Sequence, residues 1–170
     1  IDPETGLPLF TARGTLLGLG TRELVVTLPL HGLSARDGRV VWGPVRFGDV
    51  ERLDAVAQSG AVGFISWRHT DAGVLRRRIT AVQLDEGRVL WTRVFPRSID
   101  RFLACGREGD LFVTETGGRG KLIRIDTSTG EDLWSVPLPA DPGGSYQNVL
   151  QLFVDGVGKL NVRLPGRIVK

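Results

Sequence analysis

The chain has 170 residues, of which 41% are hydrophobic and 24% charged, a balance typical of a folded globular protein and not of a disordered or fibrous one. Its 22 lysines and arginines outnumber its 19 aspartates and glutamates by only three, so the net charge does not indicate a nucleic-acid-binding protein. The longest apolar run, residues 61–67, has the length of a strand and is far shorter than the roughly 18 residues of a membrane-spanning helix.

Short strands are expected along the whole chain, because apolar residues recur at every second position and glycine and proline interrupt every window long enough for a helix. The chain starts within a turn-like sequence and contains no methionine, so we expect any targeting segment to lie outside it. The expected strands, in chain order, are 15–20, 23–28, 32–35, 39–42, 53–58, 61–67, 79–84, 88–94, 102–105, 111–114, 121–126, 131–136, 149–154, 159–163 and 167–170.

A turn motif recurs between these strands, in which a glycine is followed four residues later by an aromatic residue. Aspartate and threonine precede the glycine in the best copies, which is typical of a hairpin turn. Four residues are two strand periods, so the aromatic ring lies on the same face as the glycine and can pack against the backbone of a neighbouring unit. The copies are Gly6 with Phe10, Gly38 with Trp42, Gly87 with Trp91, and Gly130 with Trp134.

An eroded fifth copy is expected at 160–166, with Gly166 in the glycine position and Lys170 in place of the aromatic. The motif glycines are then about 40 residues apart on average, the length of a four-stranded propeller blade. We therefore expect an all-β protein whose blades occupy 11–42, 43–91, 92–134 and 135–170, with 1–10 as the outer strand of a preceding blade.

The pattern Ala-x-Asp-x-x-Thr-Gly-x-x-x-Trp resembles the tryptophan-docking motif of quinoprotein-like (PQQ-like repeat) β-propellers. Asp126, Thr129, Gly130 and Trp134 match it, and the other copies keep fewer of its residues. The resemblance implies four-stranded antiparallel blades, about four of them here, in a ring of seven or eight. It also implies a docking role, between blades, for all eight glycines and aromatics of the repeated motif, and we expect Trp42, Trp91 and Trp134 to be buried there.

Four blade lengths do not close a ring of that size, and an open propeller exposes two sheet edges, which natural proteins avoid. Three arrangements remain possible. The polypeptide continues beyond these residues, two copies assemble, or four blades close on themselves; we favour the first.

Residues for catalysis, cofactor binding or metal binding are not recognised in the sequence. Cys105 is the single cysteine. The resemblance implies that a quinone-dependent dehydrogenase of this family would use an adjacent cysteine pair and Ca²⁺ ligands. His31 and His69 lie in different repeats. Trp67 lies in an apolar run and is expected in the core. We expect Cys105 to be a small buried residue.

Two further patterns have structural explanations. Asp2, Asp37, Asp85 and Asp126 recur as turn residues, so they do not form an acid–base pair. The glycine-rich stretch 117–120 lacks the Lys-Ser/Thr of a phosphate-binding loop and is expected at a hairpin end.

The most distinctive stretch is 68–78, which is expected to be an inserted loop rich in arginine. Such loops on rigid scaffolds often carry contacts. Arg68, His69, Arg76, Arg77 and Arg78 are therefore the candidate partner-binding residues, for an acidic protein surface or anionic headgroups. The alternative is a solvated hairpin tip without a partner.

The leading functional hypothesis is a non-catalytic scaffold or protein-interaction propeller, without a cofactor, in a membrane-associated complex outside the cytosol: the periplasm, cell surface or a lumen. Its partners would be other proteins or the rest of its own propeller, and not nucleic acid. Two alternatives stay open, a fragment of a quinone-dependent dehydrogenase and the ligand-sensing ectodomain of a membrane kinase. The flanking polypeptide would distinguish the three.

Overall fold

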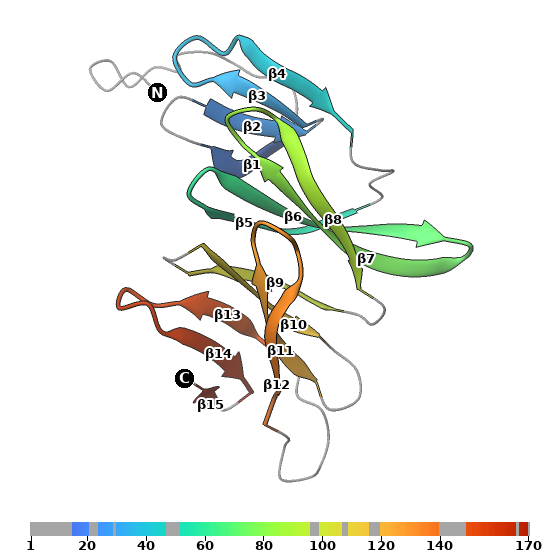
Figure 1. Cartoon of the computed structure of the whole chain (residues 1–170), viewed down its shortest axis with the longest axis vertical. Helices are drawn as coiled ribbons and strands as arrows, with labels where there is room; N and C mark the ends of the chain where they lie inside the picture. The colour runs from blue at the N-terminus through green and yellow to red at the C-terminus, as the bar shows by residue number, and fades with distance from the viewer. Residues whose placement is uncertain are drawn as a thin grey trace.

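The computed structural model shows fifteen strands in four antiparallel sheets, and no helix among the residues it describes (Figure 1). Within those residues, nothing helical is long and apolar enough to span a membrane. The expectation of an all-β protein made of four-stranded antiparallel blades is confirmed. The described residues are 15–20, 24–28, 30–46, 52–95, 99–106, 109–115, 120–139, 149–165 and 167–169.

Three sheets have four strands each and follow the chain order. The first consists of β1 (Thr15–Gly20), β2 (Leu24–Leu28), β3 (Leu30–Ser34) and β4 (Val40–Val45). The second consists of β5 (Arg52–Ser59), β6 (Val62–Asp71), β7 (Val74–Gln83) and β8 (Arg88–Phe95). The third consists of β9 (Ile99–Cys105), β10 (Asp110–Glu115), β11 (Lys121–Asp126) and β12 (Asp132–Pro137).

The sheets are stacked side by side, as propeller blades are, and the first strands of consecutive sheets contact one another (Figure 1). These contacts join β1 to β5, β5 to β9, and β9 to β13 (Gln151–Val154). The fourth strands β4, β8 and β12 occupy the opposite edges of their sheets. The repeated turn motif therefore lies at the same place in each of these three sheets, between the third and fourth strands.

The fourth sheet shows that the expected fifth motif copy is wrong. It contains β13, β14 (Leu160–Leu164) and β15 (Arg167–Val169), in that order. Because β13 takes the innermost position, 160–164 is a second strand and not the third strand that precedes a docking turn. The described residues contain no fourth strand of this sheet.

The hydrophobic cores lie between consecutive sheets. Phe64 and Ile79 of the second sheet pack with Leu111 and Val113 of the third. Strand β6 borders two cores at once, because alternate side chains of a strand point to opposite faces. Phe64 belongs to the core shared with the third sheet, whereas Ile65 and Trp67 belong to the core shared with the first. The continuous apolar run at 61–67 is thus a strand that is covered on both faces.

Candidate protein-interaction surface

Two tryptophans of the repeated motif dock on the motif of the following sheet with the same geometry. The indole nitrogen of Trp42 donates a hydrogen bond to the carbonyl oxygen of Leu84 at 2.6 Å. The indole nitrogen of Trp91 donates in the same way to Thr127, at 2.9 Å. In both cases the accepting residue stands three positions before the motif glycine, Gly87 or Gly130.

The rings lie directly against these glycines, which only glycine permits. A Cβ atom added to Gly87 would lie 2.5 Å from the Trp42 ring, and one added to Gly130 would lie 2.8 Å from the Trp91 ring. Both glycines also have positive φ angles, 66° and 78°. The glycine therefore provides the turn conformation and the flat surface for the neighbouring ring at the same time.

The tryptophans are less buried than the sequence suggested. Trp42 and Trp91 are partly buried, and Trp134 remains 37% exposed. The reason is that each ring lies near the outer edge of its sheet, where solvent reaches one side. Gly38 has the left-handed conformation of the other motif glycines, with φ of 72°. Gly6 and Phe10 lie outside the described residues.

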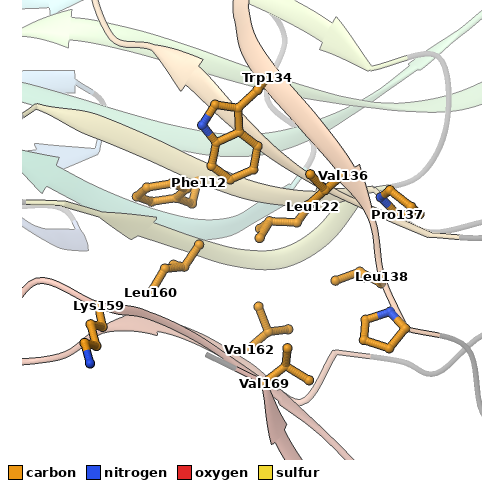
Figure 2. Close-up of a pocket in the computed structure, with 11 residues that line it drawn as sticks. Phe112, Leu122, Trp134, Val136, Pro137, Leu138, Lys159, Leu160, Val162 and Val169 are labelled. Atoms are coloured by element: carbon orange, nitrogen blue, oxygen red, sulfur yellow. The ribbon is translucent and has the colours of Figure 1, made fainter.

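An apolar cavity of about 500 Å³ lies between the third and fourth sheets, beside Trp134 (Figure 2). Trp134 and Phe112 border it on one side, with ring centroids 6.1 Å apart, and Leu160, Val162 and Val169 border it on the other. Trp134 stands four residues after its motif glycine on β12, as Trp42 and Trp91 do on β4 and β8. The remaining lining residues are Leu122, Val136, Pro137, Leu138, Pro139 and Lys159.

The basic stretch 68–78 is a β-ribbon and not the loop that the sequence suggested. Strands β6 and β7 pair without interruption up to Asp71 and Val74, and Ala72 and Gly73 form the turn with φ angles of 47° and 79°. Strand β5 begins opposite Arg68 and β8 ends opposite Arg77. Residues 69–76 therefore extend beyond the four-stranded part of the sheet as a two-stranded ribbon that projects from the molecule (Figure 1).

A buried carboxylate fixes the base of this ribbon. Asp54, whose side chain is only 3% exposed, accepts a hydrogen bond from Arg68 at 2.8 Å and one from Arg77 at 2.9 Å. Two candidate partner-binding arginines thus share one carboxylate inside the protein. Asp54 was not among the predicted site residues, although an acidic residue inside the predicted strand 53–58 was a usable signal.

The other arginines of the stretch have different surroundings. The guanidinium of Arg78 lies over the Trp67 ring, 5.3 Å from its centroid. Trp67 is fully buried, as predicted, and its indole nitrogen donates a hydrogen bond to the Thr80 hydroxyl at 2.9 Å. Arg76 is directly opposite His69 in the ribbon. No ion pair of Arg76 or Arg78 is found with any described residue.

The cysteine and the two histidines are not arranged as a catalytic or metal-binding group. Burial, together with the nearby Asp110 charge, raises the pKa of the Cys105 thiol to about 12, so the thiolate is scarce at neutral pH. His31 is on β3 and His69 on β6, in separate sheets. Among the described residues, no three His, Cys, Asp or Glu side chains are grouped as metal ligands would be.

The recurrent aspartates act in turns. Asp126 accepts hydrogen bonds from the Ser128 hydroxyl, from the Ser128 N–H and from the Thr129 N–H, which lower its pKa. Bonds from the Arg39 N–H and the Ser34 hydroxyl lower the pKa of Asp37 in the same way. Asp85 is in the corresponding turn. Asp2 and residues 117–119 of the glycine-rich stretch lie outside the described residues.

Comparisons with known proteins agree with this architecture. The PQQ-repeat family model described as "Outer membrane protein assembly factor BamB" matches residues 75–157. The structure titled "Dihydro-heme d1 dehydrogenase NirN in complex with DHE" superposes with a TM-score of 0.62 over 92% of this chain, at 16% sequence identity. The chain has the fold of a β-propeller, and its residues 75–157 match a PQQ-repeat family.

Two further solved structures superpose less well. A quinohemoprotein alcohol dehydrogenase, ADHIIG from Pseudomonas putida HK5, has a TM-score of 0.48 and 16% identity over 83% of this chain and 26% of its own. BamB from Moraxella catarrhalis has a TM-score of 0.40 and 13% identity over 86% of this chain and 56% of its own. The present propeller covers 35% of the NirN chain. No curated protein sequence matches it.

Proposed function

We propose that this PQQ-like propeller is a non-catalytic protein-interaction module of an extracytoplasmic, membrane-associated complex, and that the ribbon formed by residues 69–76 is its contact site. The observation that carries the proposal is the ribbon itself. It exposes Val74 and Leu75, 53% and 55% accessible, on a base that the Asp54 ion pairs hold rigid.

Rigidity at the base supports a binding role for the tip. A partner that contacts a preformed element does not have to order it, so less conformational entropy is lost on binding. The ribbon meets this condition, because its strands are hydrogen-bonded to the last pair before the turn and the turn residues adopt left-handed conformations. Exposed aliphatic side chains on such an element are typical of contact surfaces.

Site-specific photocrosslinking tests this proposal. A photoreactive amino acid is placed at Val74 in the full-length protein, expressed in its own cell envelope. The matched control position is Val157, which is 77% exposed in the turn between β13 and β14. We expect one discrete protein adduct from position 74 and none from 157. Identical patterns from both positions, or no adduct from either, would contradict the proposed contact site.

A calorimetric titration tests the non-catalytic part of the proposal. The chain is titrated with pyrroloquinoline quinone in the presence of Ca²⁺. We expect no stoichiometric binding heat, because Cys105 is the single cysteine of the chain. Saturable binding with one cofactor per chain would instead favour a quinone-dependent dehydrogenase.

A further inference from the structure

We propose that one face of the β6–β7 hairpin, formed by Val74 and Arg76 of the ribbon and Arg78 at its base, binds an acidic segment of a partner protein. This face is called the cationic face below. The inference rests on the proposed function, since it specifies the chemistry of the partner that the ribbon contacts. It follows from a difference among the four arginines of this hairpin: two pair with Asp54 and two make no ion pair with a described residue.

The register of the hairpin divides its side chains between two faces. Residues directly opposite each other in an antiparallel pair share a face, and faces alternate along each strand. The pairs Trp67 with Arg78, His69 with Arg76 and Asp71 with Val74 therefore share the cationic face. The pairs Arg68 with Arg77 and Thr70 with Leu75 share the opposite face.

The opposite face has its countercharge within the protein. Arg68 and Arg77 are both hydrogen-bonded to Asp54, and their side chains are only 20% and 18% exposed. Asp54 compensates only one of these charges, but it fixes both guanidinium groups at the base of the ribbon, so an external carboxylate would have to compete with it for them. Arg52, 68% exposed, adds a third cation to this face and is 3.9 Å from the same carboxylate. Leu75 remains exposed on this face.

The cationic face has no such countercharge. Arg78 is held by the Trp67 ring, and its Nε atom is buried without a hydrogen-bond partner. Arg76 makes no ion pair with any residue that the structure describes. A planar guanidinium that is already oriented on an aromatic ring loses little freedom when it forms a bidentate contact with a carboxylate. Among the residues that the structure describes, the only carboxylate on this face of the hairpin is Asp71, at the turn.

The same face favours a protein over a lipid surface. Its exposed aliphatic residues are Val74 at the tip and Val94 of β8, which is opposite Arg78 and 41% exposed. The ribbon tip carries no exposed aromatic residue of the kind that anchors proteins at membrane interfaces. A partner segment that presents carboxylates to Arg76 and Arg78, with an apolar residue for Val74, matches each of these features.

Binding of a defined peptide tests the inference. The probe is a fluorescein-labelled peptide of eight alternating glutamate and valine residues, and binding to the chain is measured by fluorescence anisotropy. A lysine–valine peptide of the same length is the control probe. We expect only the acidic peptide to bind, with an affinity that falls as salt is raised from about 50 to 300 mM, because exposed charges are screened within about 10 Å.

Matched variants locate the binding to the cationic face. We expect Arg76→Glu to weaken acidic-peptide binding at least tenfold and Val74→Ser to weaken it severalfold. Leu75→Ser is the control on the opposite face at nearly equal exposure, and Arg39→Glu repeats the charge reversal at a distant residue whose side chain is 87% exposed. Both controls should change the affinity less than twofold.

Three outcomes would overturn the inference. Equal weakening by Arg39→Glu would show attraction to the overall charge. Binding of vesicles of phosphatidylglycerol and phosphatidylcholine that depends on Arg76, without peptide binding, would show a lipid contact. Failure of the acidic peptide to bind at all would exclude an acidic partner. In that last case a crosslink from Val74 would preserve the proposed interaction function, whereas its absence would remove both.

Discussion

The indole ring of Trp91 lies against the backbone of Gly130 in the next sheet, and its N–H donates to the carbonyl of Thr127 in the same turn. Trp42 repeats this relationship with Gly87 and Leu84. The first and second sheets therefore supply the docking ring from their fourth strands, and the second and third sheets supply the turn that receives it. The repeat in the sequence encodes contacts between sheets and not only turns within them.

Gly130→Ala should destabilise the chain strongly, by about 2–5 kcal/mol, the sum of a steric and a conformational cost. The added Cβ would lie 2.8 Å from the Trp91 ring, and overpacking of this kind costs about 1–3 kcal/mol. The left-handed conformation, with φ of 78°, adds about 1–2 kcal/mol for a residue with a side chain.

Gly60→Ala is the matched control for that substitution. Gly60 also has a positive φ, 56°, but a Cβ there would have no neighbour within 4 Å. The loss of stability in Gly60→Ala should therefore be limited to the conformational cost of about 1–2 kcal/mol. Urea denaturation of both variants measures the difference, and equal losses would show that the ring contact at Gly130 does not matter.

The three motif tryptophans should not be equivalent in this chain. Trp91→Ala removes a docked ring, its hydrogen bond to Thr127 and its contact with Phe64, whose centroid is 6.0 Å away, and should cost about 2–4 kcal/mol. Trp134 is 37% exposed, so Trp134→Ala should cost less than about half as much. Chemical denaturation measures both, and equal costs would refute the distinction.

The fold was predictable because its signals are local. Period-two apolar spacing predicted the strands, with β1 matching its expected bounds, and the glycine-to-tryptophan spacing predicted the receiving turns. The fifth motif copy failed because Gly166 was judged by spacing alone. A turn between second and third strands has the same glycine composition as one between third and fourth strands, and only contacts between sheets distinguish them.

The candidate site was less predictable, because its properties depend on contacts between distant residues. The sequence indicated a cluster of arginines at 68–78, but not that Asp54 binds two of them or that Trp67 orients a third. The sequence also did not predict the continuous pairing of β6 with β7, because the charged residues at 68–78 indicated a loop, although arginine is tolerated in a solvent-exposed strand. The number of charges in the sequence therefore did not show which of them are free to bind a partner.

Cys105 should be nearly unreactive toward thiol reagents in the folded chain. Its pKa is raised to about 12, first by burial and second by Asp110, so at pH 8 only about one thiol in ten thousand is ionised. An unfolded cysteine with a pKa of about 8.5 is roughly one quarter ionised at that pH. Reaction with Ellman's reagent should be at least about a hundredfold slower in buffer than in urea. Comparable rates would show that the thiol is accessible.

Asp126 should contribute stability that disappears in acid. Its folded pKa is lowered by the Ser128 hydroxyl and by backbone N–H donors, so its ionised form stabilises the fold above the unfolded pKa of about 3.9. This contribution declines as the pH falls through the folded pKa. Asp126→Asn retains an acceptor oxygen without the charge.

The urea midpoint of the Asp126→Asn variant should therefore lie below that of the parent chain at pH 7, and the gap should close toward pH 2.5. Asp37→Asn should show the same trend, because the Arg39 N–H and the Ser34 hydroxyl lower the pKa of Asp37. A gap that is independent of pH would mean that charge is not the source of the effect.

Asp54→Asn should destabilise the chain by about 2–4 kcal/mol, since it removes the charge that compensates Arg68 and Arg77 in a site where the carboxylate is 3% exposed. Glu86→Gln is the control, because the Glu86–Arg88 pair is 59% and 61% exposed and should contribute less than about 1 kcal/mol. Urea denaturation of both variants measures the difference.

A double variant tests whether the uncompensated arginines cause this loss of stability. Adding Arg77→Met to Asp54→Asn should then recover part of the lost stability, because one uncompensated charge is replaced by an apolar side chain of similar length. A double variant that is less stable than Asp54→Asn would show instead that Arg77 stabilises the base of the ribbon through contacts other than its ion pair.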